Sequence, residues 1–120
     1  MNYFMVVIGG AAGAVGRFGL SQAFGKSNSF PFTTFLINIA GSLLIGLLFG
    51  MQQQGRLPEK YWALLAAGLC GGFTTFSAFS LENMVLLQQH KWLLFGLYAL
   101  GSVAACLVAV YLGYKITYKL

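Results

Sequence analysis

The fold is decided by one stretch of the chain, Gly71-Gly72-Phe73-Thr74-Thr75-Phe76-Ser77-Ala78-Phe79-Ser80-Leu81-Glu82. Adjacent glycines followed by two β-branched threonines are poor material for a helix. The stretch nevertheless lies inside an apolar segment, residues 61–87, that is long enough to span a membrane. We therefore expect Gly71-Gly72 to interrupt a buried helix. The freed peptide groups must then be buried in protein, line water or bind an ion.

The composition of the whole chain indicates that its surroundings are lipid. Of the 120 residues, 58% are hydrophobic and only 8% are charged, whereas about 25% of the residues in a soluble domain are charged. Four segments are long and apolar enough to span a membrane, at about residues 3–24, 33–51, 61–87 and 92–114. We predict an all-α membrane protein, with one four-helix transmembrane domain over residues 1–120 and a third helix that is broken mid-membrane.

Seven basic residues against two acidic ones give the chain a formal net charge of +5. The basic residues stand singly at the ends of apolar runs, which suits anchoring at lipid headgroups and argues against nucleic-acid binding. They divide almost evenly between the two sides of the membrane: Arg56, Lys60, Lys115 and Lys119 on one, Lys26 and Lys91 on the other, with Arg17 if it reaches the headgroups. This bias is weak, so one preferred orientation and insertion in both orientations remain open.

Small residues recur four positions apart in every span: Gly9 and Gly13, Ala12 and Gly16, Gly46 and Gly50, Gly68 and Gly72, and Ala105, Ala109 and Gly113. This spacing lets helix backbones approach closely in lipid. Because four short helices enclose little space, it also favours an oligomer. Cys70 and Cys106 lie in apolar segments, and we expect them to be packing residues rather than a disulfide or a metal pair.

Polar residues inside the spans form three helical stripes. The stripes are Thr34, Asn38 and Ser42 in the second span, Tyr98, Ser102 and Cys106 in the fourth, and Phe76, Phe79 and Asn83 in the third, with Thr75 and Glu82 beside the last. Hydroxyl and amide groups dominate and carboxylates are nearly absent, so the stripes offer hydrogen-bond donors that suit an anion losing its water. Hydrogen bonding between helices explains the same pattern equally well.

Three further features of the spans bear on an ion. Carbonyls freed at a mid-span break are good ligands for a hard cation such as Na⁺. The rings of Phe76 and Phe79 carry a positive edge that can face an anion, although such residues more often face lipid or a core. Arg17 either draws anions toward a pore mouth or reaches to a headgroup, and Glu82 is the one acid within a span.

Together these residues resemble the Fluc (CrcB) family of fluoride channels. The motif from Gly71 to Glu82 is specific to that family, and the likeness covers essentially the whole chain. The first span, residues 9–18, is similar to the family's glycine-rich helix with its arginine, here Arg17. The second, residues 34–41, is similar to its threonine-to-asparagine segment, and the stripe from Tyr98 to Cys106 matches its polar fourth helix.

The resemblance implies a homodimer of two oppositely oriented subunits in a prokaryotic plasma or inner membrane, with two fluoride pores and passive fluoride efflux. It implies that the broken third helices cross on the twofold axis, where the backbone carbonyls of Gly71 and Thr74 hold one structural Na⁺ that is not transported. It implies an ion pathway along Phe76, Phe79, Asn38, Ser102, Thr75, Tyr98, Thr34 and Glu82, with Arg17 at an aqueous vestibule. Ala78 and Cys106 depart from the family, which commonly has a threonine and a hydroxyl there.

Two other classes of membrane protein fit a small four-span chain. A proton-coupled multidrug transporter needs a carboxylate in its first span, where this chain has Arg17. An accessory subunit without transport activity would have no use for aligned donor stripes. An enzyme is not expected, because no paired acids, no nucleophile with its base and no cluster of metal ligands stand out in the sequence.

Overall fold

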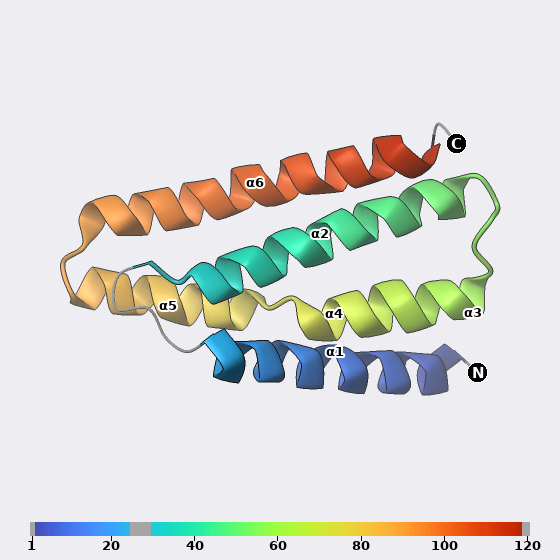
Figure 1. The fold of residues 1–120 in the computed structure, drawn as a ribbon, viewed down its shortest axis with the longest axis horizontal. Coiled ribbons are helices and arrows are strands. Elements are labelled where there is room, and N and C mark those ends of the chain that lie inside the picture. Colours follow the sequence, from blue (N-terminus) through green and yellow to red (C-terminus); the bar gives the residue numbers. More distant parts are fainter. Residues whose placement is uncertain (1, 25–29, 119–120) are drawn as a thin grey trace.

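The structure, a computed structural model, describes residues 2–24 and 30–118, and all of its regular elements are helices. Their bounds are α1 (Asn2–Phe24), α2 (Phe32–Gln53), α3 (Glu59–Trp62), the π-helix η1 (Ala63–Cys70), α4 (Gly71–Phe73), α5 (Phe76–Gln88) and α6 (Trp92–Tyr118). The elements from α3 to α5 follow one line, so the described residues form four long rods (Figure 1). Each rod is long and apolar enough to span a membrane, which confirms the prediction of four long apolar helices.

The rods run back and forth, so that the described ends of the chain and the α2–α3 loop lie at one end of the molecule and the α5–α6 turn at the other (Figure 1). Two contacts hold the first of these ends together. Asn2 Nδ2 donates to Glu59 Oε1 over 3.4 Å, and Arg56 Nη2 donates to the Thr117 carbonyl over 2.8 Å. Arg56, Lys60 and Lys115 lie at this end and Lys91 at the other, whereas Lys26 and Lys119 fall outside the described residues.

The α1 rod packs on the first half of the third rod through glycines. A Cβ atom built on Gly68 would lie 2.9 Å from Gly9 Cα, closer than real side chains approach. Gly13 and Gly72 meet the facing backbone in the same way. These glycines therefore serve close backbone contact in lipid, as their spacing predicts.

A second glycine interface joins α2 to α6. A Cβ on Gly46 would lie 3.0 Å from Val110 Cα, and one on Gly113 would lie 2.8 Å from Leu47 N. At the end of this interface Thr117 Oγ1 donates to the Leu47 carbonyl over 2.8 Å. Ala12 and Gly16 are exposed within one subunit, and a Cβ on Gly16 would meet only the ring of Phe73, 3.8 Å away, so Gly16 makes no close backbone contact there.

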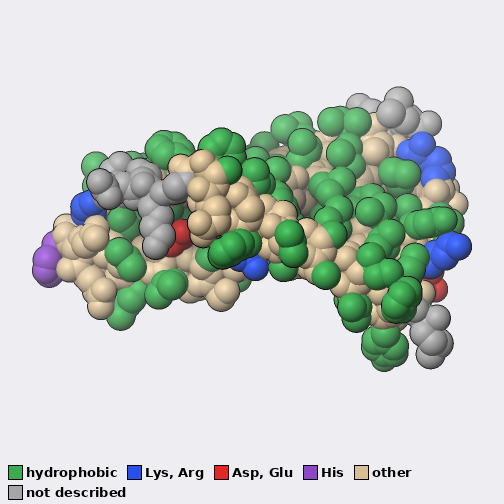
Figure 2. All heavy atoms as spheres, turned by 60° about the horizontal axis from the view of Figure 1, so that its bottom comes forward, with side chains coloured by type: hydrophobic (Ala, Val, Ile, Leu, Met, Phe, Trp, Pro, Cys, Tyr) green, Lys and Arg blue, Asp and Glu red, His purple; other side chains and the backbone are tan. Residues whose placement is uncertain are grey.

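Few side chains are buried within one chain, as expected for a protein whose outer surface meets lipid or another subunit. Leu48, Ala66 and Cys70 form a cluster of buried residues, with Leu44, Ile45 and others packed against it. Cys70 is thus a packing residue, as predicted, and both cysteines are free thiols. Figure 2 shows hydrophobic side chains over the middle of one face, with most basic side chains toward its two ends.

The overall shape is flat. The molecule measures 48 × 30 × 20 Å, and the shortest extent is about two helix diameters. The α1 rod lies along the α3–α4 half of the third rod, while α6 lies along α2 on the other side (Figure 1). A flat molecule of this kind leaves broad faces open.

Candidate functional site

The third rod loses its helical backbone at Thr74 and Thr75. Thr74 has φ −85° and ψ 155°, and Thr75 has φ −149° and ψ 124°, which are extended conformations. A new helix, α5, starts at Phe76, and Thr75 caps it because its Oγ1 accepts the Ala78 N–H over 3.1 Å. The interruption is thus two residues long and ends in an ordinary N-cap.

The predicted place of the interruption is wrong by three residues. Gly71 and Gly72 are helical, and Gly71 has φ −62° and ψ −38°. Gly72 packs closely against the backbone of Gly10 and Ala14 in α1, and the helix continues through both glycines to Phe73. The β-branched threonines, which favour extended backbone, take the break instead.

Asn38 of α2 stabilises the break by pairing with the backbone of Thr75. Its Oδ1 accepts the Thr75 N–H over 3.0 Å, and its Nδ2 donates to the Thr75 carbonyl over 3.4 Å. On the other side of the break, Thr74 Oγ1 donates to the Cys70 carbonyl over 2.8 Å. Both peptide groups of Thr75, which a bare break would leave unpaired, are therefore paired by the Asn38 side chain, as a membrane interior favours.

The carbonyls of Gly71 and Thr74 lose the donors that a continuous helix would give them. The Thr75 N–H, which would bond to Gly71, goes to Asn38, and the Ala78 N–H, which would bond to Thr74, goes to Thr75 Oγ1. Unwound carbonyls of this kind coordinate Na⁺ in membrane proteins. Residues 2–24 and 30–118 contain no cluster of three His, Cys, Asp or Glu residues that could hold a metal, so a cation here would need such backbone oxygens. The two carbonyls therefore fit the predicted sodium site chemically.

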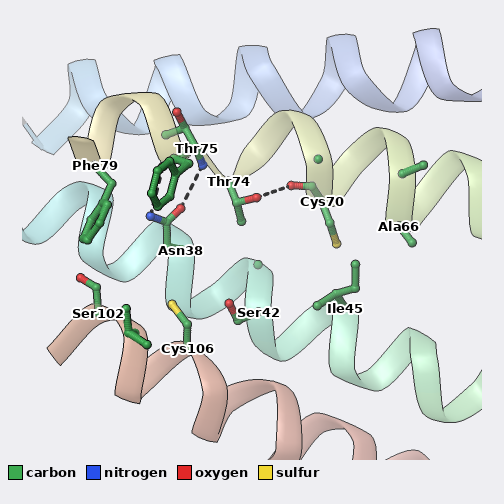
Figure 3. Close-up of a pocket in the computed structure, with 15 residues that line it drawn as sticks. Asn38, Ser42, Ile45, Ala66, Cys70, Thr74, Thr75, Phe79, Ser102 and Cys106 are labelled. Carbon is green, nitrogen blue, oxygen red and sulfur yellow. Dashed lines mark hydrogen bonds between the residues drawn. The ribbon is translucent and has the colours of Figure 1, made fainter. Parts of the chain in front are cut away.

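An open cavity of about 410 Å³ lies beside the break, between α2, the third rod and α6. Figure 3 shows Asn38, Thr74, Thr75 and Phe79 on one part of its wall and Ser102 and Cys106 on the α6 side. The complete lining is Asn38, Gly41, Ser42, Ile45, Ala66, Ala67, Cys70, Gly71, Thr74, Thr75, Phe76, Phe79, Ser102, Val103 and Cys106. Gly41, Ile45, Ala66, Ala67 and Val103 carry no chemical signal in the sequence and were missed. Only the helical spacing of Gly41 and Ile45 from Asn38 could have indicated the two of them on α2.

The two predicted phenylalanines stand at the same end of this cavity with different surroundings. Their ring centroids are 5.5 Å apart, and the ring of Phe79 lies 5.1 Å from that of Tyr98. Phe79 is half-buried, whereas Phe76 is 78% exposed. Phe76 therefore projects away from the subunit.

Ser102 carries a buried hydroxyl without a partner. The residue is 5% exposed, it lines the cavity, and its Oγ makes no hydrogen bond to any described residue. The only other such side-chain atom in the described part of the chain is Asn83 Oδ1, whose amide nitrogen donates to the Phe79 carbonyl over 2.9 Å. A buried polar atom nearly always has a partner, so the Ser102 hydroxyl is free to bind something that enters the cavity.

Glu82 lies outside the cavity in a compact polar cluster. Thr34 Oγ1 donates to one carboxylate oxygen over 2.8 Å, and the Tyr98 hydroxyl donates to the other over 2.7 Å. Thr34 and Tyr98 are buried, at 7% and 0% exposed. The structure thus brings these three predicted residues together from α2, α5 and α6, about one helical turn from Asn38, Ser102 and Phe79.

Arg17 lies on the α1 side of the third rod. Its Nε donates to the Gly72 carbonyl over 3.3 Å, a contact that the sequence did not reveal. The side chain is half-buried, so it does not simply extend to a headgroup. A cation at the last carbonyls of a helix is favourable, because the helix dipole places negative charge there.

Comparisons with known proteins identify the family. Residues 4–114 match the family model described as CrcB-like protein, Camphor Resistance (CrcB). The chain is 42% identical to the fluoride-specific ion channel FluC of Paramagnetospirillum magneticum, with 95% of this chain and 93% of the relative covered. It is 39% identical to FluC of Shewanella oneidensis, covering 98% and 97%, and 42% identical to FluC 2 of Rhodococcus jostii, covering 98% and 99%.

These relatives are named as ion channels and not as enzymes, in agreement with the prediction that the chain is not an enzyme. The four long apolar helices and the relatives together make it a multi-pass protein of the cell membrane. The matched region includes the Thr74–Thr75 break, Asn38 and the cavity that they form. The chain belongs to the CrcB family.

Proposed function

We propose that the chain is one subunit of a fluoride channel that lets fluoride leave the cell passively and so protects it from fluoride toxicity. The observation that carries this proposal is the cavity at the Thr74–Thr75 break, where donor groups from three rods meet. The proposed ion is fluoride because the relatives are named as fluoride-specific ion channels. The chemistry of the cavity explains why an anion is suited to it.

The cavity offers an anion donors and no competing charge. Asn38 carries an amide, and Thr75 and Ser102 carry hydroxyls. None of the 15 residues that line the cavity is acidic, and the one carboxylate nearby, Glu82, is held by Thr34 and Tyr98. The edges of the Phe76 and Phe79 rings add partial positive charge without a strong binding site. Weak sites in series let an ion leave as readily as it enters.

Two oppositely oriented copies would complete the conduit. The cavity is open on one side, and Phe76 is 78% exposed beside it. A second subunit laid on this face closes the cavity and receives the Phe76 ring, and the symmetry gives two pores. The basic residues at the two ends of the molecule are nearly balanced, which is compatible with insertion in both orientations.

A sodium ion between the two copies would be held by the carbonyls of Gly71 and Thr74 from each subunit. Both carbonyls have lost their helical donors. The bound cation would supply positive charge that balances these oxygens and fixes the two breaks against each other. It is part of the structure and is not transported.

A fluoride-selective electrode on protein-containing vesicles tests the proposal. Vesicles loaded with fluoride are diluted into fluoride-free medium, and a potassium ionophore removes the charge that builds up. We expect rapid fluoride efflux with or without a proton gradient. Efflux that needs a proton gradient, or proton movement that depends on a cationic drug, would instead support the transporter. If neither fluoride efflux nor drug-dependent proton movement is detected, the result would support an accessory subunit without transport activity.

The orientation is tested separately with a tag at the C-terminus. In a mixed population the tag should be reached by an impermeant label from both faces of the membrane. Labelling from one face alone would end the proposal of opposite orientations.

A further inference from the structure

Cys106 stands in the wall of the cavity, where its thiol is accessible. It is a free thiol of α6, half-buried, and it lies one turn after Ser102 on the same face. Figure 3 shows its sulfur in the cavity between Ser102 and Ser42, below Asn38. A thiol in this place adds chemistry that a hydroxyl lacks, because a thiolate attacks soft electrophiles.

A second observation indicates that small molecules can be held at this spot. The Ser102 hydroxyl, 5% exposed and without a partner, lines the same cavity. A molecule that enters can therefore receive a hydrogen bond from Ser102 while it lies beside the sulfur of Cys106. The cavity, at about 410 Å³, has room for a group of several atoms.

We propose that Cys106 is a modification site for small, uncharged sulfur electrophiles, and that the mixed disulfide formed there obstructs the ion pathway. The inference rests on the proposed function only for its second half, the effect on ion passage. The reacting group is the Cys106 thiolate, whose proton goes to the buffer. With methyl methanethiosulfonate, the thiolate attacks the sulfenyl sulfur, a new S–S bond forms, and methanesulfinate leaves with the electrons of the broken S–S bond.

The adduct acts on the pathway in two ways. It replaces a thiol that can donate a weak hydrogen bond by an apolar methylthio group that cannot. It also fills space among Asn38, Ser42 and Ser102, the polar residues that lie around the sulfur. Both changes raise the free energy of an anion in the cavity relative to water.

The chain contains a matched control in its other thiol. Cys70 borders the same cavity but is only 3% exposed and packs against Leu48 and Ala66. Leu48 and Ala66 thus shield the Cys70 side chain, whereas the Cys106 side chain is only half-buried. We expect Cys106 to react at least about tenfold faster than Cys70, since access controls thiol reactivity.

The experiment uses the full-length protein in vesicles, treated with methyl methanethiosulfonate and then analysed by peptide mass spectrometry and by fluoride efflux. We expect the methylthio group on Cys106 before Cys70, and a fall in efflux of about tenfold, the change expected when a donor to a desolvated ion is lost. A thiol reductant should reverse both. Efflux of each variant is compared with that of the same variant before treatment. Measured in this way, the efflux of Cys106→Ser should not change on treatment, and the efflux of Cys70→Ala should fall as it does for the parent chain.

The outcomes separate this inference from the proposed function. An unlabelled Cys106 in protein that conducts fluoride, or full efflux after complete labelling of Cys106, overturns the inference and leaves the channel intact. If untreated protein passes no fluoride, the proposed function fails together with the effect on the pathway, and the labelling alone then decides whether Cys106 is the reactive thiol.

Discussion

Asn38 is the side chain that joins the interruption of the third rod to α2. Its amide pairs with both peptide groups of Thr75, 37 residues away in the sequence. The helical spacing of Thr34, Asn38 and Ser42 was enough to place Asn38 on a polar face, because that spacing is local. Its partner is set by how α2 packs on the third rod, and no local pattern carries that information.

Replacing Asn38 with Leu should weaken both the fold and the conduction of fluoride. The side chains are similar in volume, but Leu leaves the Thr75 N–H and carbonyl without these partners, at a cost of about 1–3 kcal/mol. We expect a lower melting temperature in detergent and less fluoride efflux. Ser42→Ala, which changes the same wall without touching Thr75, serves as the control and should melt close to the parent chain. Equal melting temperatures for the two variants would show that the Asn38 pairing does not stabilise the break.

Replacing Phe76 or Phe79 with Ile should reduce fluoride efflux by at least about tenfold while the dimer still forms. An aliphatic side chain fills similar space but has no positive edge to face an anion. Efflux is measured with the fluoride electrode, and the oligomeric state by size-exclusion chromatography. Phe18→Ile, at an exposed position of α1 away from the cavity, controls for the loss of a ring. Parental efflux in both cavity variants would remove the rings from the mechanism.

Five of the eight residues that were predicted along an ion pathway lie around one cavity, whereas Glu82, Thr34 and Tyr98 form a cluster outside its lining. Asn38, Thr75, Phe76, Phe79 and Ser102 all line one cavity. Glu82 does not line it, because its carboxylate is bound by hydroxyls from α2 and α6. The sequence shows that an acid at membrane depth needs partners, yet it does not show which side chains reach it.

At the scale of the helices, the four long apolar rods were predictable and the position of the break was not. Length and hydropathy define a span from local composition alone. The glycine pair had two possible uses, backbone freedom or close packing, and the structure shows close packing of Gly72 on the backbone of α1, whereas Gly71 is helical and exposed. The π-helix η1 before them was not predicted either. Such segments are rare and are often found at functional sites.

Arg17 is expected to stabilise the end of α4. Arg17→Leu removes the donor of the hydrogen bond from Arg17 Nε to the Gly72 carbonyl, so it should lower stability by about 0.5–2 kcal/mol. Any loss of efflux should be the same at low and high ionic strength. If stability is unchanged and efflux falls only at low salt, Arg17 acts instead by attracting anions to a vestibule, since salt screens such attraction.

The turns at the ends of α2 and α5 form a matched pair. Both place a residue in the left-handed region, Gly55 with φ 72° and His90 with φ 59°, and both close with a bond from the next N–H, Arg56 to Met51 and Lys91 to Leu86. Glycine adopts this conformation freely, whereas other residues are strained in it. We expect His90→Gly to raise stability by about 0.5–1 kcal/mol and Gly55→Ala to lower it by a similar amount. Thermal unfolding in detergent measures both, and changes of the same sign would contradict this account of the turns.

At the scale of the whole molecule, one chain leaves several groups open around the break. Its cavity is open, the carbonyls of Gly71 and Thr74 lack their helical donors, and Phe76 projects outward. The sequence indicated an oligomer through its many small residues, but it could not say which face is used. We propose the face at the break, because Gly71, Thr74 and Phe76 all line the same open cavity.

The claim on which the account depends is that the break meets the same break of a second copy. Gly71 offers a probe, because it is exposed and a Cβ there would have no neighbour closer than 4.0 Å. In a background of Cys70→Ala and Cys106→Ser, Gly71→Cys should form a disulfide-linked dimer under mild oxidation. The matched control is Leu93→Cys, 76% exposed but near the start of α6 and outside the cavity.

The measurement is the fraction of covalent dimer on a non-reducing gel for the protein in membranes. If the breaks of two copies meet, Gly71→Cys should give a dimer band that disappears on reduction, and Leu93→Cys should give little or none. A Gly71→Cys variant that stays monomeric, or that cross-links no better than Leu93→Cys, would contradict this contact between two copies.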